Sequence, residues 1–380
     1  MRRTVAVVTG TRAEFGLLTP ILKAIRDDRR RFRLKVVAAG QHFVASHGST
    51  WREIPKAGFR IDARVRAPEP RADPAWMGEA LGAMTAGFSR LFARIRPDWL
   101  LVLGDRAEPL AAALAATELG GIAIAHLHGG EVTGHRLDDQ GRRMLSALAH
   151  LHLPATALSA RRLKAMGEAA WRIHLVGAPG LDSILSSKPS ARADVRRRYG
   201  LPGSVPYLIL SQHAVPHQAS QAGAQIRQTL QALDRIGLPV IACSPNTDAG
   251  GEGILQALRA SRKVRFHASL PHADYLALLR DASALVGNSS SGIIEAPSFG
   301  TPSVDVGVRQ AGRERTVHVV SAPHRASAIE AAVRRVLAPA FRRRIARVPS
   351  PYGDGRTTPK VVRLLASAKM DDRLLEKSHA

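Results

Sequence analysis

Short apolar runs rich in β-branched residues alternate along this chain with longer stretches of helical periodicity, and that alternation restricts the folds open to it. Strands separated by helices predict βαβ units, which build parallel sheets with helices on both faces. We therefore predict an α/β protein. The runs that predict strands are Thr4–Val8, Leu34–Ala39, Trp99–Gly104, Ile122–Ala125, Tyr207–Ser211, Pro239–Ala242, Val264–His267, Ala284–Gly287 and Ser303–Val306.

A polar stretch rich in Lys, Pro, Ser and Arg, Ser186–Arg198, interrupts the pattern, which then restarts. The chain has 380 residues, and at roughly 100–200 residues per domain this length suggests two domains. We predict two doubly wound α/β domains joined near residue 185. Such sheets bind ligands at the carboxyl ends of their strands, so two facing sheets would place those ends on a shared cleft.

The composition is that of a globular protein, with 45% apolar and 23% charged residues. The lone cysteine, Cys243, excludes an intrachain disulfide framework and fits a reducing compartment. The first residues, MRRTVAVVTGTRAEFG, lack the cleavage site of a signal peptide, and their apolar run is too short to span a bilayer. We therefore expect a cytoplasmic protein with no membrane partner.

The formal net charge of +24 raises nucleic-acid binding as one interpretation. However, the basic residues are scattered, aromatic residues make up only 4%, and no basic stripe carries interleaved aromatics for stacking bases. We expect no nucleic-acid partner and, instead, a positive site for an anionic ligand. The histidines lack the close Cys, His or Asp spacing of a metal site, so no metal is expected.

Polar residues gather where the predicted strands end. Each loop alone is a weak signal, because any α/β loop can carry Gly or Asp. Six together, all at the ends where such sheets bind ligands, favour a functional site. These loops are Thr9–Glu14, Gly40–His42, Gly104–Arg106, His126–Glu131, Ser211–His213 and Ser244–Asn246.

The segment VGNSSSGIIEAPSFG, residues 286–300, carries the strongest signal. Serine hydroxyls, glycines and backbone N–H groups at a helix N-terminus offer donors and a positive dipole to an anion. The alternative is an ordinary Ser N-cap, which needs one serine and not three between two glycines. Glu295 follows one helical turn later, where it either takes ribose hydroxyls or faces solvent.

Several motifs, in order and with family-like spacing over roughly residues 4–365, resemble the UDP-N-acetylglucosamine 2-epimerases. The closer match is the hydrolysing branch that supplies sialic-acid-type sugar synthesis. The motifs are GTRAEFGLL at 10–18, LGDRAE at 103–108, HLHGGEVT at 126–133, LDDQGR at 137–142, GNSSSGIIEAPSFGTPSVDVGVRQAGR at 287–313 and PYGDGRT at 351–357.

This resemblance implies the GT-B fold, with two Rossmann-like domains and a cleft between them. Residues 1–180 would hold the sugar and the catalytic acids, and residues 181–356 would bind the nucleotide diphosphate. A helix within residues 357–380 would pack back on the first domain. The resemblance implies neither a metal nor a cofactor, and we expect a homodimer or homotetramer that acts on a nucleotide-diphosphate sugar.

The implied chemistry starts from the C2 hydrogen of an N-acetylhexosamine, which is not acidic because no carbonyl adjoins it. Departure of the diphosphate from C1 develops positive charge there and acidifies the C2 hydrogen, so the enzyme needs a stabilised leaving group and a positioned base. Elimination gives a 2-acetamidoglucal. Addition of water, with a proton delivered to the opposite face of C2, then releases N-acetylmannosamine.

Carboxylates suit the proton transfers, and cationic or neutral donors suit the diphosphate. By resemblance, Asp105 and Asp138 match family catalytic acids, His213 matches a His near the diphosphate, and Arg142 matches an Arg of the same helix as Asp138. The predicted catalytic residues are Asp105, Glu131, Asp138 and His213. The predicted substrate-binding residues are Arg12, Glu14, His42, Arg106, His128, Arg142, Asn246, Ser289, Ser290, Ser291, Gly292, Glu295 and Arg313.

Structural alternatives stay open for several of these residues. Asp105 could cap the helix that follows its strand, and His213 could be purely structural. Asp138 and Asp139 open a helix together, so one is expected to be an N-cap and the other a catalyst. A non-hydrolysing epimerase, a retaining glycosyltransferase and a basic nucleic-acid-binding protein remain the rival functions.

The chain also departs from the family pattern at several positions. Many members have Glu where this chain has His128, and a Ser-Ile-Arg-His run where it has Gln140–Arg143. Gly134–Arg136 replaces a smaller, acidic stretch, and Val308 stands where Asp is common. These departures leave the nucleotide, UDP or GDP, and the acetamido sugar open.

Overall fold

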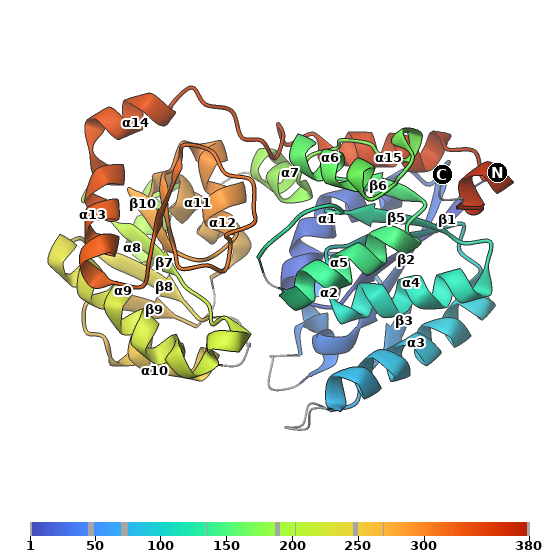
Figure 1. The fold of residues 1–380 in the computed structure, drawn as a ribbon, viewed down its shortest axis with the longest axis horizontal. Helices are drawn as coiled ribbons and strands as arrows, with labels where there is room; N and C mark the ends of the chain where they lie inside the picture. Colours follow the sequence, from blue (N-terminus) through green and yellow to red (C-terminus); the bar gives the residue numbers. More distant parts are fainter. Residues whose placement is uncertain are drawn as a thin grey trace. The chain divides into compact units, whose positions relative to one another are not determined.

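The computed structural model describes residues 2–44, 49–69, 75–134, 136–186, 191–201, 203–245, 250–268 and 270–377. The chain forms two compact units, each drawn in Figure 1. Unit 1 comprises Met1–Ser183 and Tyr352–Ala380, and unit 2 comprises Ile184–Pro351. Unit 2 is therefore inserted in the sequence of unit 1. Among the described residues, no helix is long and apolar enough to cross a membrane.

Unit 1 is built on a six-stranded sheet of order β3-β2-β1-β4-β5-β6, in which all neighbouring strands are parallel. The strand order reverses between β1 and β4, which makes their carboxyl ends the switch point where doubly wound sheets bind ligands. The strands are β1 (Arg3–Thr9), β2 (Phe32–Ala39), β3 (Ala63–Val65), β4 (Trp99–Leu103), β5 (Ala123–Leu127) and β6 (Leu151–Leu153).

Alternate side chains of β1 point to opposite faces of this sheet, and a core covers each face. Val5 and Val7 belong to one buried cluster, whereas Ala6 and Val8 belong to the other. The helices of unit 1 are α1 (Arg12–Asp27), α2 (Glu53–Lys56), α3 (Trp76–Ile95), α4 (Ala107–Leu119), α5 (Arg136–Leu148), α6 (Ala157–Ala165), α7 (Pro179–Ser186, which reaches into unit 2), α15 (Thr357–Ser367) and α16 (Asp372–Leu375).

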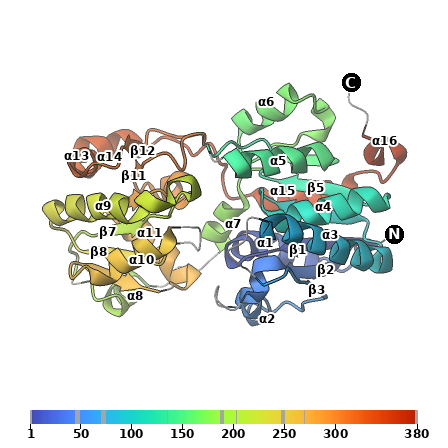
Figure 2. The ribbon, with the colours of Figure 1, turned by 60° about the horizontal axis from the view of Figure 1, so that its bottom comes forward.

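The chain returns to unit 1 through α15, which packs against α1. Val361 and Leu365 of α15 are fully buried in the same cluster as Val5 and Val7. Figure 2 shows α15 and α16, in red, among the blue and green elements of unit 1. One face of the unit 1 sheet is thus completed by residues that follow unit 2 in the sequence.

Unit 2 repeats the same winding. Its parallel sheet has the order β12-β11-β10-β7-β8-β9, with the reversal between β7 and β10. The strands are β7 (Leu208–Ser211), β8 (Val240–Cys243), β9 (Val264–His267), β10 (Ala284–Gly287), β11 (Ser303–Val306) and β12 (Val319–Ala322). The helices are α8 (Arg192–Arg198), α9 (Ala222–Ile236), α10 (Gly251–Ala260), α11 (His272–Asp281), α12 (Ser291–Ile294), α13 (Ala326–Leu337) and α14 (Pro339–Ile345).

The predicted fold class, two doubly wound α/β units with parallel sheets, is confirmed. Three strands are missing from the sequence prediction, namely β3, β6 and β12. Each lies at a sheet edge and has only three or four residues.

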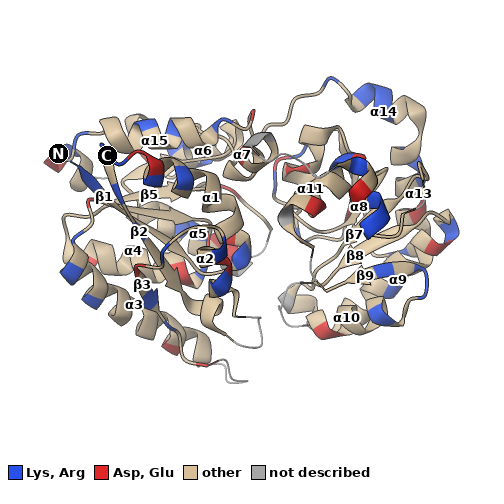
Figure 3. Ribbon diagram, turned by 180° about the vertical axis from the view of Figure 1, so that it is seen from behind, with Lys and Arg blue, Asp and Glu red and all other residues tan. Residues whose placement is uncertain are grey.

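The basic residues do not form a single stripe on the side of the molecule drawn in Figure 3. Lys and Arg occur on helices of both units, including α3 and α15 of unit 1 and α9, α13 and α14 of unit 2, with Asp and Glu among them. Several of the arginines form ion pairs with carboxylates on their own unit, as Arg196 does with Asp281 at 2.5 Å. This distribution matches the scattered charge of the sequence.

Candidate active site

The predicted loops meet in pairs at the two switch points. In unit 1 β1 is hydrogen-bonded to β4, so the loops that begin at Gly10 and Gly104 leave the same edge of the sheet. In unit 2 β7 is hydrogen-bonded to β10, so the loops that begin at Gln212 and Asn288 do the same. Each unit therefore carries its own group of polar loops where ligands bind such sheets.

The loop after β1 is fixed by a capping box at the start of α1. Thr11 accepts a hydrogen bond from the N–H of Glu14, and the Glu14 carboxylate accepts from the N–H groups of Gly10 and Thr11 at 2.7 and 3.1 Å. Burial raises the pKa of Glu14 to about 7. Glu14 was predicted to contact substrate, but the structure uses its carboxylate to close the helix. Arg12, on the first turn, is exposed.

His42 requires a correction, because the structure does not leave it open to a ligand. Its side chain is fully buried, with one ring nitrogen 3.1 Å from the Thr9 hydroxyl and the other 2.8 Å from the Thr50 hydroxyl. Burial lowers the pKa of His42 to about 4, so the ring is neutral. His42 joins two loops and does not bind substrate directly in this conformation.

Glu108, which was not among the predicted site residues, connects the loops at this edge of the sheet. Its buried carboxylate accepts from the N–H of Gln41 at 3.1 Å and pairs with Arg106 at 3.2 Å. A Cβ atom at Gly10 or Gly40 would come within 3 Å of this side chain, so both glycines make room for it. The glycine that follows each of β1 and β2 was the sequence signal for such a close contact.

Asp105 pairs with Arg142 and does not cap α4. The Arg142 guanidinium donates to the Asp105 carboxylate and, at 2.9 Å, to the carbonyl of His128. The N-cap of α4 is Arg106, and no side chain caps that position. Arg142 is almost fully buried whereas the Asp105 side chain is 18% exposed, so the carboxylate is held at the edge of the site.

His128 and Glu131 form a buried pair in the loop after β5. Nδ1 of His128 lies 2.5 Å from a carboxylate oxygen of Glu131. His128 has a backbone φ of 62°, a left-handed conformation that is unfavourable for a residue with a side chain. The residue that departs from the family pattern is therefore a direct partner of a predicted catalytic carboxylate.

The two aspartates at the start of α5 have separate surroundings. The Asp139 carboxylate accepts from the N–H of Thr133 at 2.7 Å, from its hydroxyl at 2.9 Å and from the N–H of Gly134 at 3.1 Å. Asp139 is thus a structural residue, but neither aspartate is the expected N-cap, because α5 begins at Arg136 and both lie inside its first turn. Asp138 is half-buried on the same turn.

Gly141 explains how α5 comes so close to Asp105. A Cβ atom at this position would lie 2.6 Å from the backbone carbonyl oxygen of Asp105, which is closer than such atoms approach in real structures. The glycine that departs from the family pattern is therefore needed for close packing. It places Arg142, the next residue, beside the Asp105 carboxylate.

In unit 2 the turn after β10 is joined to the loop after β7. Gly287 has a φ of 131°, and a Cβ atom there would lie 2.1 Å from the carbonyl oxygen of Ser211. Asn288 exchanges two hydrogen bonds with the backbone of His213, at 2.7 and 2.9 Å. Burial, together with nearby Arg309, lowers the pKa of His213 to about 3. His213 therefore adjoins the turn as a neutral imidazole.

The donors of this turn differ from those expected. The helix that follows, α12, has only four residues, so the predicted helix dipole is small. The N–H of Gly292 already binds the carbonyl of Ser289, and the Ser291 hydroxyl accepts from Tyr275 at 2.6 Å. Within the described part of the chain, the Ser290 N–H has no acceptor, so it can donate to an anion.

Two further side chains at this turn were quoted within a motif but not singled out. Arg309 and Gln310 each donate to the carbonyl of Asn288 at 3.1 Å. Arg313 is half-buried in the same loop, and its N–H binds the carbonyl of Gln310. Glu295 lies at the C-terminus of α12, and Asn246 lies outside the described residues.

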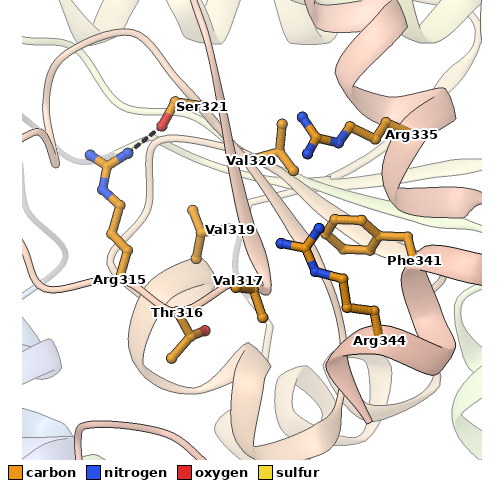
Figure 4. Close-up of a pocket in the computed structure, with 9 residues that line it drawn as sticks. All are labelled: Arg315, Thr316, Val317, Val319, Val320, Ser321, Arg335, Phe341 and Arg344. Atoms are coloured by element: carbon orange, nitrogen blue, oxygen red, sulfur yellow. Dashed lines mark hydrogen bonds between the residues drawn. The ribbon is translucent and has the colours of Figure 1, made fainter. Parts of the chain in front are cut away.

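A cavity of about 440 Å³ lies elsewhere in unit 2, against the edge strand β12. It contains none of the predicted site residues, and Figure 4 shows its lining. Among the described residues, no group of three His, Cys, Asp or Glu side chains is placed to hold a metal ion. The switch-point loops therefore remain the candidate site.

The chain is similar in sequence to proteins of one family. Residues 23–366 match the model of the family described as UDP-N-acetylglucosamine 2-epimerase. A UDP-N,N'-diacetylbacillosamine 2-epimerase (hydrolyzing) of Legionella pneumophila is 35% identical, with all of both chains covered. A UDP-N-acetylglucosamine 2-epimerase of Neisseria meningitidis is 36% identical, over 82% of this chain and 81% of the relative.

Solved structures share the fold at lower sequence identity. A UDP-GlcNAc 2-epimerase from Neisseria meningitidis bound to UDP-GlcNAc superimposes with a TM-score of 0.84 at 17% identity. The alignment covers 95% of this chain and 99% of that one.

Proposed function

The chain belongs to the UDP-N-acetylglucosamine 2-epimerase family, and from this premise we propose that it is a hydrolysing 2-epimerase. Its substrate would be UDP-N-acetylglucosamine or a related UDP- or GDP-acetamido sugar. Its products would be the N-acetylmannosamine-type sugar, a precursor of sialic-acid-type sugars, and the nucleotide diphosphate. The observation that carries this proposal is the set of paired acidic side chains in unit 1, Asp105 with Arg142 and Glu131 with His128.

Unit 2 would bind the diphosphate as it leaves C1. The Ser290 N–H and the hydroxyls of Ser289 and Ser290 would donate hydrogen bonds to the diphosphate. Arg309 and Arg313 supply positive charge in the adjoining loop. The imidazole of His213 is neutral, so it would act as a hydrogen-bond donor to the leaving group and not as a cation. Such preorganised donors stabilise charge that develops in the transition state.

Unit 1 would carry the proton transfers. A carboxylate removes the C2 proton while the C1–O bond breaks and its electron pair leaves with the diphosphate, which gives the 2-acetamidoglucal. Water then adds at C1 and gives up one proton to a carboxylate, while a second acid delivers a proton to the opposite face of C2. Asp105, Glu131 and Asp138 are the candidates. A proton taken up by the Glu131–His128 pair could pass across one 2.5 Å hydrogen bond.

Turnover in D2O, followed by NMR, tests this mechanism. We expect free manno-configured sugar that carries deuterium at C2, together with free nucleotide diphosphate. Turnover with a fully protonated C2 would rule out elimination. Parallel assays with UDP-N-acetylglucosamine and UDP-N,N'-diacetylbacillosamine, the sugars in the names of the two relatives, would identify the preferred substrate.

The non-hydrolysing epimerase is the second candidate, because the relative at 36% identity is named simply UDP-N-acetylglucosamine 2-epimerase. The same experiment separates the two. A non-hydrolysing enzyme would interconvert two nucleotide sugars, with deuterium at C2 of both, and free sugar would not accumulate.

A further inference from the structure

The segment Asp371–Lys377, which includes α16, is held firmly in unit 1. Asp371 caps α16, and Leu374 is buried in the core cluster that contains α15. The guanidinium of buried Arg172 donates to the carbonyls of Arg373, Leu374 and Glu376, at 2.7, 2.8 and 3.1 Å. Arg172 thus satisfies the carbonyls that a helix C-terminus leaves unpaired.

Lys377 extends from this segment to the end of α5. Its ammonium donates to the carbonyls of Ser146 and Ala147, at 3.0 and 2.7 Å, and to the Glu168 carboxylate at 2.7 Å. An ammonium has three protons, so all its donors are used. A positive charge at the last carbonyls of a helix is favourable, because the helix dipole is negative there.

Glu168 balances the positive charge of Lys377. Its second carboxylate oxygen lies 2.8 Å from Nε2 of fully buried His152. Burial opposes the charge of Glu168, but hydrogen bonds from His152 and Lys377 lower its pKa. The contact with Lys377 is therefore a largely buried ion pair, in which the Lys377 side chain is 11% exposed and the Glu168 side chain 2% exposed.

Ser146 connects this end of α5 to the loop of Asp105. Nε2 of His126 lies 2.8 Å from the carbonyl of Gly104 and donates to it, so Nδ1 is the acceptor for the Ser146 hydroxyl at 3.2 Å. Gly141 of the same helix contacts the carbonyl of Asp105. Lys377, Ser146 and His126 therefore form a continuous path to the residue that precedes Asp105.

We propose that the segment Asp371–Lys377 is a positioning element for the reaction site, with Lys377 as its positioning residue. By holding the last turn of α5, Lys377 fixes the position of that helix relative to the loop that contains Asp105. It thereby fixes Asp138 and Arg142 relative to the Asp105 carboxylate. This inference rests on the proposed function, in which these residues act on the sugar.

The test compares Lys377→Met with Lys369→Met, an exposed lysine between α15 and α16. We expect Lys377→Met to lower kcat by about tenfold to a hundredfold, since small displacements of catalytic groups have such effects. The Kd for UDP, which the proposal assigns to unit 2, should be unchanged. Hydrogen exchange of the amides in residues 138–148, measured without substrate, should become faster. Lys369→Met should alter none of these values.

A double variant separates positioning from charge balance. Lys377→Met alone leaves the buried Glu168 carboxylate without its ammonium, and Lys377→Met with Glu168→Gln removes that imbalance. If Lys377 acts on α5, the double variant regains stability but keeps the low kcat and the fast exchange of α5. Recovery of kcat together with stability would overturn the inference.

The two proposals fail in different ways. A wild-type protein that turns over no nucleotide sugar would refute the proposed function. Unchanged hydrogen exchange of α5 in Lys377→Met would overturn the positioning role, whatever the substrate, because that measurement needs none.

Discussion

Asp138 and Asp139 are adjacent on the first turn of α5, and the Asp139 carboxylate accepts two hydrogen bonds from the backbone that precedes the helix. We predict that Asp139→Asn destabilises the protein by about 1–3 kcal/mol. The substitution replaces one carboxylate oxygen, which accepts hydrogen bonds, by an NH2 group, which cannot accept from the N–H and O–H groups around it. Asp138→Asn should instead abolish turnover, because the proposed function gives Asp138 a proton transfer that an amide does not perform. Urea unfolding and kcat, measured on both variants, check this. Equal loss of turnover in the two would contradict the assignment.

The pKa of Glu14 makes stability depend on pH. In the folded protein this pKa is raised from 4.5 to about 7, so between these values the folded state binds more protons than the unfolded state. The unfolding free energy should therefore fall as the pH rises from about 5 to 7, by at most about 3 kcal/mol. Glu14→Gln removes the titrating group and should flatten this profile in urea unfolding.

The matched control for Glu14 is Glu118→Gln, on the exposed surface of α4. It should leave the pH profile of stability unchanged. A Glu14→Gln variant with the wild-type profile would show that another group carries the dependence.

At the scale of residues, the sequence predicted which loops carry the site but not the direction in which each of their side chains points. Gly40–His42 was predicted as a site loop, yet the ring of His42 turns inward to two threonine hydroxyls. Glu108 was not singled out because helical periodicity does not reveal a carboxylate that fits between two glycines. Such contacts join residues far apart in the chain, and a local pattern does not contain them.

At the scale of elements, α5 determines how the acidic groups of unit 1 come together. Gly141→Ala should lower kcat and destabilise the fold by about 1–3 kcal/mol, since the added methyl group would overlap the Asp105 carbonyl. Gly82→Ala, in an exposed and open part of α3, should stabilise by about 0.5–1 kcal/mol. Thermal unfolding and turnover of both variants test this contrast. A stabilised Gly141→Ala variant would refute the close packing.

The elements themselves were largely readable from the sequence, because central parallel strands are continuous apolar runs. The central strands β10 and β11 were predicted with their observed bounds, and the edge strand β9 was as well. The edge strands β3, β6 and β12 were missed because pairing with a neighbour, and not their own composition, makes them strands. For α12 the serines and glycines indicated a helix start but not that the helix ends after one turn.

At the scale of the whole molecule, the core of unit 2 comes from one continuous stretch of the chain, whereas the core of unit 1 comes from two. Residues 184–351 contain both buried clusters of unit 2, so we predict that this fragment folds alone. Residues 1–183 lack Val361, Val362 and Leu365, which complete a core of unit 1, so they should be markedly less stable. Circular dichroism and urea unfolding of both fragments test this prediction.

A peptide of residues 352–380 provides the control for the unit 1 fragment. Added in trans, it should raise the stability of 1–183 in a concentration-dependent way, since it restores the missing core residues. Native stability of 1–183 without the peptide would contradict the role assigned to α15.

The insertion of unit 2 between the two parts of unit 1 also has a consequence for biosynthesis. Residues 184–351 emerge from the ribosome before the residues of α15 do, so the second unit can begin to fold while the first still lacks part of its core. Until then one apolar face of the first sheet is only partly covered. The nascent chain is therefore most exposed to aggregation, and most in need of a chaperone, during the interval in which the inserted unit is translated.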